Sequence, residues 1–155
     1  MRSPFDIRVS AGRLPSLLND PAVLLPGFME SLKVVYINEI LEQLRKRTMS
    51  RQSKVEYEAR LRLALESLGL PKIATVTEDL LSRSMTISYR RPYYILGFSS
   101  RSLLPEGSRV TVDRYLRLIE FGTKDVRPLS FIVRARRIVE SRLPALWLDY
   151  YHEGE

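Results

Sequence analysis

The segment 115–136 ends one helix and begins another within a few residues, and this limits the folds open to the chain. Thr111 suits a helix cap, and the apolar residues that follow it recur at steps of three and four: Val112, Tyr115, Leu116 and Ile119. Gly122 is a typical helix stop, and Pro128 suits the first turn of a last helix that continues to about Leu143. The segment therefore predicts two helices joined by a tight connection.

Three further helices are predicted upstream of this segment. Apolar residues at helical spacing indicate helices over 30–47 and 53–68. Thr77 precedes two acidic residues and predicts a short helix that ends at about Ser84.

Two runs rich in β-branched and aromatic residues, 85–89 and 93–98, flank Arg90, Arg91 and Pro92. This pattern is typical of a β-hairpin or of two sheet strands. The chain is therefore expected to be α+β, with a small antiparallel sheet (hairpin about 85–98) packed against amphipathic helices.

The 155 residues fit one domain with a segment at each end. Residues 1–27 contain four prolines and no helical spacing, yet they are too apolar for a disordered linker. We expect an extended arm that packs either on its own domain or on a neighbour. The α+β domain covers 28–144, where Pro144 should kink or restart the last helix. Residues 145–155 form an apolar, aromatic tail.

No residue pattern indicates catalysis, a cofactor or a metal. The chain has no cysteine, and its one histidine, His152, lies close to the C-terminus. Phosphate-binding loops, nucleophile elbows and zinc-binding helix motifs are absent from the sequence. No apolar run approaches the roughly 20 residues that span a bilayer, and the N-terminus has no signal-peptide pattern. A protein that is not an enzyme and has no membrane partner is expected.

The formal net charge of +7 is carried mainly by scattered arginines. Basic residues indicate either an anionic partner such as nucleic acid or ion pairs across protein interfaces. Arg90 and Arg91 lie among Tyr89, Tyr93 and Tyr94, a mixture that a single-strand stacking surface uses. The alternative is that alternate tyrosines face the core and the arginines mark the turn. Any DNA contact would involve the backbone and would not be sequence-specific.

Glu120 lies in the last turn of its predicted helix, where the helix dipole disfavours a negative charge. A cationic partner is therefore expected, either Arg127, Arg134 or Arg136, from the same chain or from a neighbour. Two interpretations stay open, a salt bridge at a subunit interface and a solvated surface glutamate. The interface interpretation predicts that Glu120→Gln weakens assembly more than folding.

The run Ile119-Glu120-Phe121-Gly122-Thr123, followed by Arg127-Pro128 and Phe131, resembles a known family. It is similar to the Glu-Phe-Gly-Thr…Arg-Pro-Phe segment of head–tail connector, neck and tail-completion proteins of long-tailed bacteriophages, including the minor tail protein Z-like group. The order of predicted elements over about 77–142 also agrees. Two residues, Leu129 and Ser130, separate Pro128 from Phe131, so neck protein, tail terminator and head-closure relative all stay open.

The resemblance implies a non-enzymatic structural protein of the virion neck or tail, assembled in the host cytoplasm. Such proteins form rings, often hexamers, that join the head connector to the tail, and genomic DNA passes through the channel. Their partners are copies of themselves and neighbouring connector, head-closure, tail-tube or tail-terminator proteins. The alternative is a basic accessory protein that binds nucleic acid without sequence specificity through Arg90 and Arg91.

Residues of three regions are candidates for subunit contacts: the motif, the loop 99–108 and the C-terminal tail. They are Glu120, Phe121, Arg127, Arg134, Arg136, Leu103, Leu104, Trp147 and Tyr150. For Leu103 and Leu104, the alternative is that their loop packs on its own core.

Overall fold

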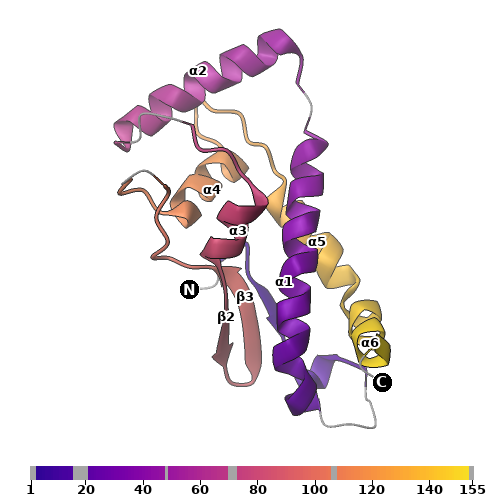
Figure 1. Ribbon diagram of the computed structural model, residues 1–155. Coiled ribbons are helices and arrows are strands. Elements are labelled where there is room, and N and C mark those ends of the chain that lie inside the picture. The colour runs from indigo at the N-terminus through magenta and orange to yellow at the C-terminus, as the bar shows by residue number, and fades with distance from the viewer. Residues whose placement is uncertain (1–2, 16–20, 48, 70–72, 106–107, 154–155) are drawn as a thin grey trace.

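The computed structural model describes residues 3–15, 21–47, 49–69, 73–105 and 108–153 (Figure 1). Within these residues six α-helices accompany one three-stranded antiparallel sheet, which confirms the α+β class. The strands are β1 (Ile7–Val9), β2 (Met85–Arg90) and β3 (Tyr93–Phe98), in the order β1-β3-β2. The hairpin predicted over 85–98 is β2 and β3.

The expected N-terminal arm is largely part of this domain. Phe5, Ile7 and Val9 are buried, and Ile7 pairs with Leu96 of β3. The Tyr36 hydroxyl donates to the Phe5 carbonyl over 2.6 Å and holds the start of β1. Of the two alternatives for the arm, packing on its own domain is therefore confirmed around β1. The bound at residue 27 is wrong, because residues 21–27 are helical.

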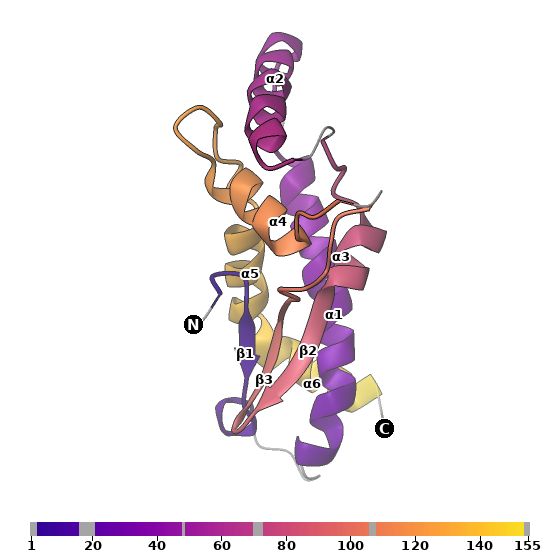
Figure 2. The same ribbon diagram turned by 90° about the vertical axis from the view of Figure 1, so that its left-hand side faces the viewer.

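Helix α1 (Pro21–Arg45) is the central element of the fold. It contacts α3 (Glu78–Ser84), α5 (Ile132–Ser141), α6 (Leu143–Glu153) and both hairpin strands. Figure 2 shows the sheet in front of α1, α5 and α6, so helices cover one face of the sheet. Side chains of α1 and α5 fill the space between the layers: Leu32, Tyr36, Ile40, Ile132, Ala135 and Val139.

Helix α1 begins earlier than the predicted residue 30, although Pro26 lies inside it. The neighbouring Phe28 is buried and its ring centroid lies 5.1 Å from that of Trp147 in α6. Burial of these aromatic rings stabilises a helical turn that proline disfavours by about 3 kcal/mol in a helix interior. The sequence shows the proline, but it does not show the aromatic packing that offsets the cost of proline in the helix.

The C-terminal tail is also part of the core. Residues 143–153 form α6, which restarts after α5 with Pro144 in its first turn, as the proline predicts. Trp147 is 0% exposed, and its Nε1 donates to the Pro15 carbonyl over 3.2 Å. Tyr150 is half-buried against Phe28. The prediction of a subunit contact is wrong for Trp147, because apolar burial holds its ring on α1, and it stays a prediction for the half-buried Tyr150.

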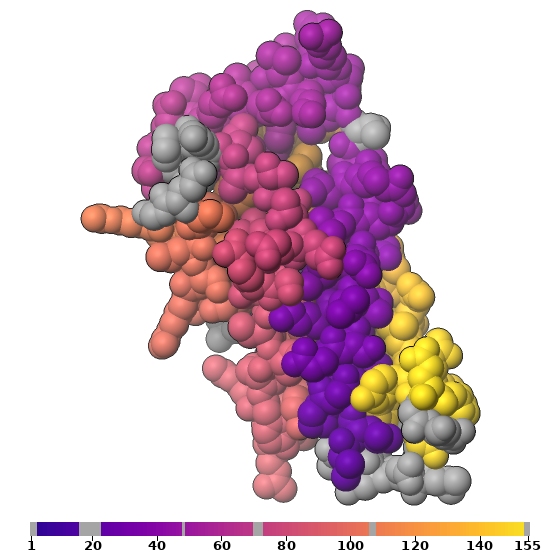
Figure 3. Space-filling view, in the orientation of Figure 1, coloured from indigo at the N-terminus to yellow at the C-terminus, as the bar shows by residue number. Residues whose placement is uncertain are grey.

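Helices α2 (Arg51–Ser67) and α4 (Val112–Phe121) complete the structure. Ser50, Thr77 and Thr111 cap α2, α3 and α4, each accepting a backbone N–H three residues on, as predicted for the two threonines. Helix α2 lies across the end of the molecule farthest from α6 (Figures 1 and 3). Only Leu61 and Leu65 of α2 are buried, so most of this helix faces solvent.

Candidate interaction sites

The motif residues form a joint that fixes α4 to α5. Gly122 ends α4 with φ +69°, and its N–H donates to the Leu118 carbonyl over 2.8 Å. The chain then folds back along α4, because Leu129 and Ser130 donate to the carbonyls of Ile119 and Glu120 over 2.9 and 3.1 Å. Two helix ends that follow each other in sequence are therefore held side by side.

The carboxylate of Glu120 completes this joint from within. Glu120 is 1% exposed, and its Oε1 accepts the N–H groups of Phe131 and Ile132, both over 2.7 Å. Its Oε2 accepts the N–H of Val133 over 3.0 Å. These amides are unpaired donors at the positive end of α5, where a carboxylate is stabilised by charge and by hydrogen bonds.

Both sequence interpretations of Glu120 are therefore wrong. Its partners are backbone amides and not an arginine, and burial removes it from any subunit interface. The prediction considered the dipole of α4 alone, whereas α5 supplies the compensating positive end. Helix α5 begins at Ile132 and not near Pro128, because Glu120 caps it there. A glutamate unfavourable on its own helix, placed shortly before a second helix, was the available signal.

Arg136 is also an internal residue rather than an interface residue. Its Nη1 donates to the Pro4 carbonyl, and its Nε lies 3.1 Å from Glu140 Oε1. The side chain is only 20% exposed, because it holds the segment before β1 against α5. Phe121, in contrast, is 51% exposed and stacks on Phe5 with ring centroids 5.9 Å apart.

The loop that contains Leu103 and Leu104 packs on its own domain. Leu104 is buried, and its N–H donates to the Val110 carbonyl over 3.0 Å. Leu103 forms an isolated bridge with Thr111 and leaves its side chain exposed. The contact prediction is therefore wrong for Leu104, because apolar burial holds it in the core, and it stays a prediction for Leu103.

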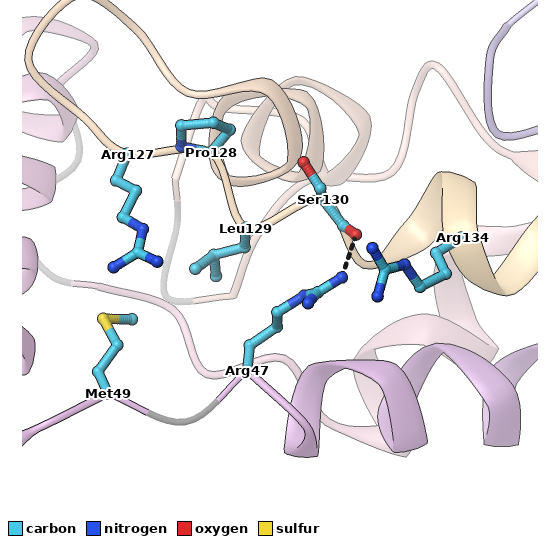
Figure 4. Close-up of a pocket in the computed structure, with 7 residues that line it drawn as sticks. All are labelled: Arg47, Met49, Arg127, Pro128, Leu129, Ser130 and Arg134. Carbon is cyan, nitrogen blue, oxygen red and sulfur yellow. Dashed lines mark hydrogen bonds between the residues drawn. The ribbon is translucent and has the colours of Figure 1, made fainter.

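Arg127 and Arg134 line a pocket that the sequence did not indicate, together with Arg47, two residues after the end of α1 (Figure 4). Its remaining lining residues are Met49, Pro128, Leu129 and Ser130. We call this site the arginine pocket; its volume is about 200 Å³. Sequence reasoning missed Arg47 because the pocket joins two segments that are distant in sequence, 47–49 and 127–134.

The second basic site is the uncovered face of the sheet, called here the sheet face (Figure 2). The guanidinium carbons of Arg8 and Arg13 each lie 5.8 Å from the centroid of the Tyr93 ring, at cation–π distance. Arg90 pairs with Tyr93 across the hairpin. A shallow hollow beside them is lined by Asp6, Arg8, Thr86, Ser88, Arg90, Ile95, Gly97 and Phe98.

The tyrosines of the hairpin differ in how far they pack against the core. Tyr94 lies on the core side of β3 and is half-buried, whereas Tyr89 beside it is mostly exposed. Their ring centroids are 4.8 Å apart. The expected alternation is therefore present: Tyr94 lies on the core side, and the adjacent Tyr93 lies on the sheet face beside the arginines.

A search of the described residues finds no group of three or more His, Asp or Glu side chains placed to bind a metal ion. Among the same residues, no helix has both the length and the apolar character needed to cross a bilayer. In comparisons with known proteins, no family model, no curated protein and no solved structure matches this chain.

Proposed function

We propose that this chain is a structural, non-enzymatic subunit of a tailed-bacteriophage neck. It forms a hexameric ring that joins the head connector to the tail or completes the tail, and genomic DNA passes through the channel. The motif resemblance is one support for this proposal. The other is the large surface that the single chain leaves exposed.

The observation that carries the proposal is the amount of surface that the single chain leaves uncovered. The molecule exposes 9783 Å². A compact monomer of this length exposes about 8,000 Å². The difference is of the size that a protein–protein interface buries. Helix α2 contributes to it, since Val55 and Leu63 on its outer side are 63% and 67% exposed.

A ring needs two different surfaces on each subunit that complement each other. The outer side of α2 is apolar in part, whereas the arginine pocket and the sheet face are basic. Separate surfaces of different character suit the heterologous contacts of a ring. Phe121, beside the motif, is a further exposed apolar contact.

Light scattering coupled to size exclusion tests the proposal, with electron microscopy of the oligomer fraction. We expect a closed oligomer of defined mass, either alone or after addition of purified connector and tail proteins. Leu63→Ser should shift the protein toward monomer with an unchanged melting temperature, because Leu63 is exposed. Arg62→Ser is the matched control, because Arg62 directly precedes Leu63 in α2 and is also exposed. A monomer at every concentration, with and without these proteins, refutes the proposal.

A second candidate function is a basic accessory protein that binds nucleic acid without sequence specificity. The sheet face favours it, because Arg8 and Arg13 lie over the Tyr93 ring and Arg90 is paired with Tyr93 across the hairpin. Aromatic rings beside arginines bind single strands by stacking and by phosphate contacts. In a ring, the same face would suit the wall of a DNA channel.

A further inference from the structure

The arginine pocket brings three cations together without an internal acidic partner. None of the four ion pairs of the described residues includes Arg47, Arg127 or Arg134. An adjoining hollow is lined by Glu56 and by Arg127, which also lines the pocket. Among the ion pairs of the described residues, none joins Glu56 to Arg127. Three guanidinium groups of like charge are more stable close together when an anion lies between them.

Arg47 is fixed in place and keeps one donor unused. Its Nη2 donates to the Ser130 carbonyl over 3.1 Å, which orients the guanidinium toward the joint (Figure 4). Its Nε is buried and makes no hydrogen bond to any described residue. Arg134 lies on the same side of the pocket in Figure 4, and Arg127 lies beyond Leu129. A buried donor without a partner is costly, so a bound acceptor would stabilise this arrangement.

The size and walls of the pocket restrict what it can take. Its volume of about 200 Å³ is below the ~300–1,000 Å³ of cofactor and small-molecule sites. It therefore suits a single side chain. Met49, Pro128 and Leu129 give the pocket an apolar part beside its arginines. A ligand that combines one carboxylate with a neighbouring apolar group matches both parts.

We propose that the arginine pocket binds the carboxylate of an acidic side chain that a partner protein presents beside an apolar residue. The carboxylate accepts hydrogen bonds from the guanidinium groups, whose planar fork matches its two oxygens. The adjoining apolar residue covers Leu129 and Met49. This binding does not require that the chain forms a ring.

A nucleic-acid phosphate is the main rival for the pocket. The phosphates and bases of a single strand bind best to an open basic surface with exposed aromatic rings, such as the sheet face. The pocket has no aromatic residue in its lining and is concave. The apolar part of its wall favours a protein side chain.

The test is an NMR titration of the isotope-labelled protein with the capped dipeptide acetyl-Glu-Leu-amide. The matched probe is acetyl-Gln-Leu-amide, which has the same shape without the charge. We expect saturable shifts of the Arg47 Nε–H signal and of the Ser130 amide with the glutamate probe, and at least tenfold weaker binding of the glutamine probe. Arg134→Gln should weaken binding at least fivefold, whereas Arg142→Gln, outside the pocket, should leave it unchanged.

Several outcomes overturn the proposal. One is equal binding of both probes, and another is a glutamate response spread over arginines outside the pocket. A third is saturation of the same signals by a dT12 oligonucleotide at lower concentration, with the same dependence on Arg134, which would assign the pocket to nucleic acid. The amide spectrum of each variant shows whether it is folded. Because the titration follows residues of the pocket within a single chain, failure to form a ring would not affect it.

Discussion

At the residue scale, Glu120 is a buried acceptor for three amides of α5. Glu120→Gln keeps the shape but removes the charge and turns one acceptor oxygen into a donor. We expect it to lower the free energy of unfolding by about 2–3 kcal/mol, since hydrogen bonds to charged groups are the strong ones. Urea unfolding followed by circular dichroism measures this change.

The control for this substitution is Glu66→Gln on the exposed side of α2, which should change the unfolding free energy by less than about 0.5 kcal/mol. Equal effects of both substitutions would contradict the capping role. The expected loss of monomer stability is the reverse of the sequence interpretation, in which assembly suffers more than folding.

Two buried tyrosines, Tyr36 and Tyr115, and the half-buried Tyr57 link stability to alkaline pH. Burial raises the pKa of Tyr57 to about 12, and burial also raises the pKa of Tyr36 and of Tyr115 above the ordinary value. The folded state therefore favours the neutral phenols. Their contribution to stability is complete below the unfolded pKa of about 10 and is lost as the pH rises above it.

The Tyr57 hydroxyl is buried and has no hydrogen-bond partner among the described residues. Tyr57→Phe should therefore leave stability at pH 7 unchanged or raise it by up to about 1 kcal/mol, and reduce the decline above pH 10. Tyr115→Phe is the contrast, because it loses a 2.6 Å bond to the Ala74 carbonyl and should be destabilising at pH 7. Urea unfolding from pH 8 to 11.5 measures both. An unchanged alkaline decline in Tyr57→Phe would contradict the assignment.

At the element scale, the joint between α4 and α5 depends on Gly122. An alanine Cβ there would overlap the Val126 carbonyl oxygen and lie 2.8 Å from the Pro128 nitrogen, at a φ of +69°. Gly69 also has a positive φ, +83°, but a Cβ added there would have no atom within 4 Å. Gly69→Ala should therefore show the backbone cost alone, about 1–2 kcal/mol.

Gly122→Ala adds a steric overlap to that cost, and we expect it to destabilise the protein by at least about 2 kcal/mol more than Gly69→Ala. The difference between their urea midpoints, at equal slopes, is the measurement. Similar midpoints would mean that the joint can shift to admit a side chain, and that the close approach of 126–128 is not required.

At the scale of the whole molecule, the two basic sites lie on different parts of the surface, so variants of one site can be tested without changing the other. If the sheet face binds nucleic acid, Arg8→Gln and Arg90→Gln should each weaken binding of a dT20 oligonucleotide. Each should also reduce the slope of log affinity against log salt concentration by about 1. Arg62→Gln on α2 is the control of equal charge. Fluorescence anisotropy over a salt series measures this effect.

A loss of affinity in the Arg62→Gln control equal to that in the sheet-face variants would indicate only a general charge effect. Absence of binding at low salt would refute the second candidate function altogether. Neither outcome bears on the arginine pocket, whose test uses a peptide.

Local physical chemistry alone determined much of this protein. Apolar spacing predicted the helices near 51–67 and 112–121, and the β-branched runs predicted the hairpin. The caps Thr77 and Thr111 predicted the starts of α3 and α4. These features depend on neighbours within a few residues. The same reasoning identified Glu120 as unfavourably placed on its own helix.

Tertiary structure decided the rest, because it supplies partners that are distant in sequence. It joined β1 to the sheet, made 21–27 helical under the aromatic rings of α6, and placed the carboxylate of Glu120 on the amides of α5. It also gathered Arg47, Arg127 and Arg134 into one pocket. Burial and hydrogen bonding between distant segments can offset a local preference of a few kcal/mol, and no local pattern contains those contacts.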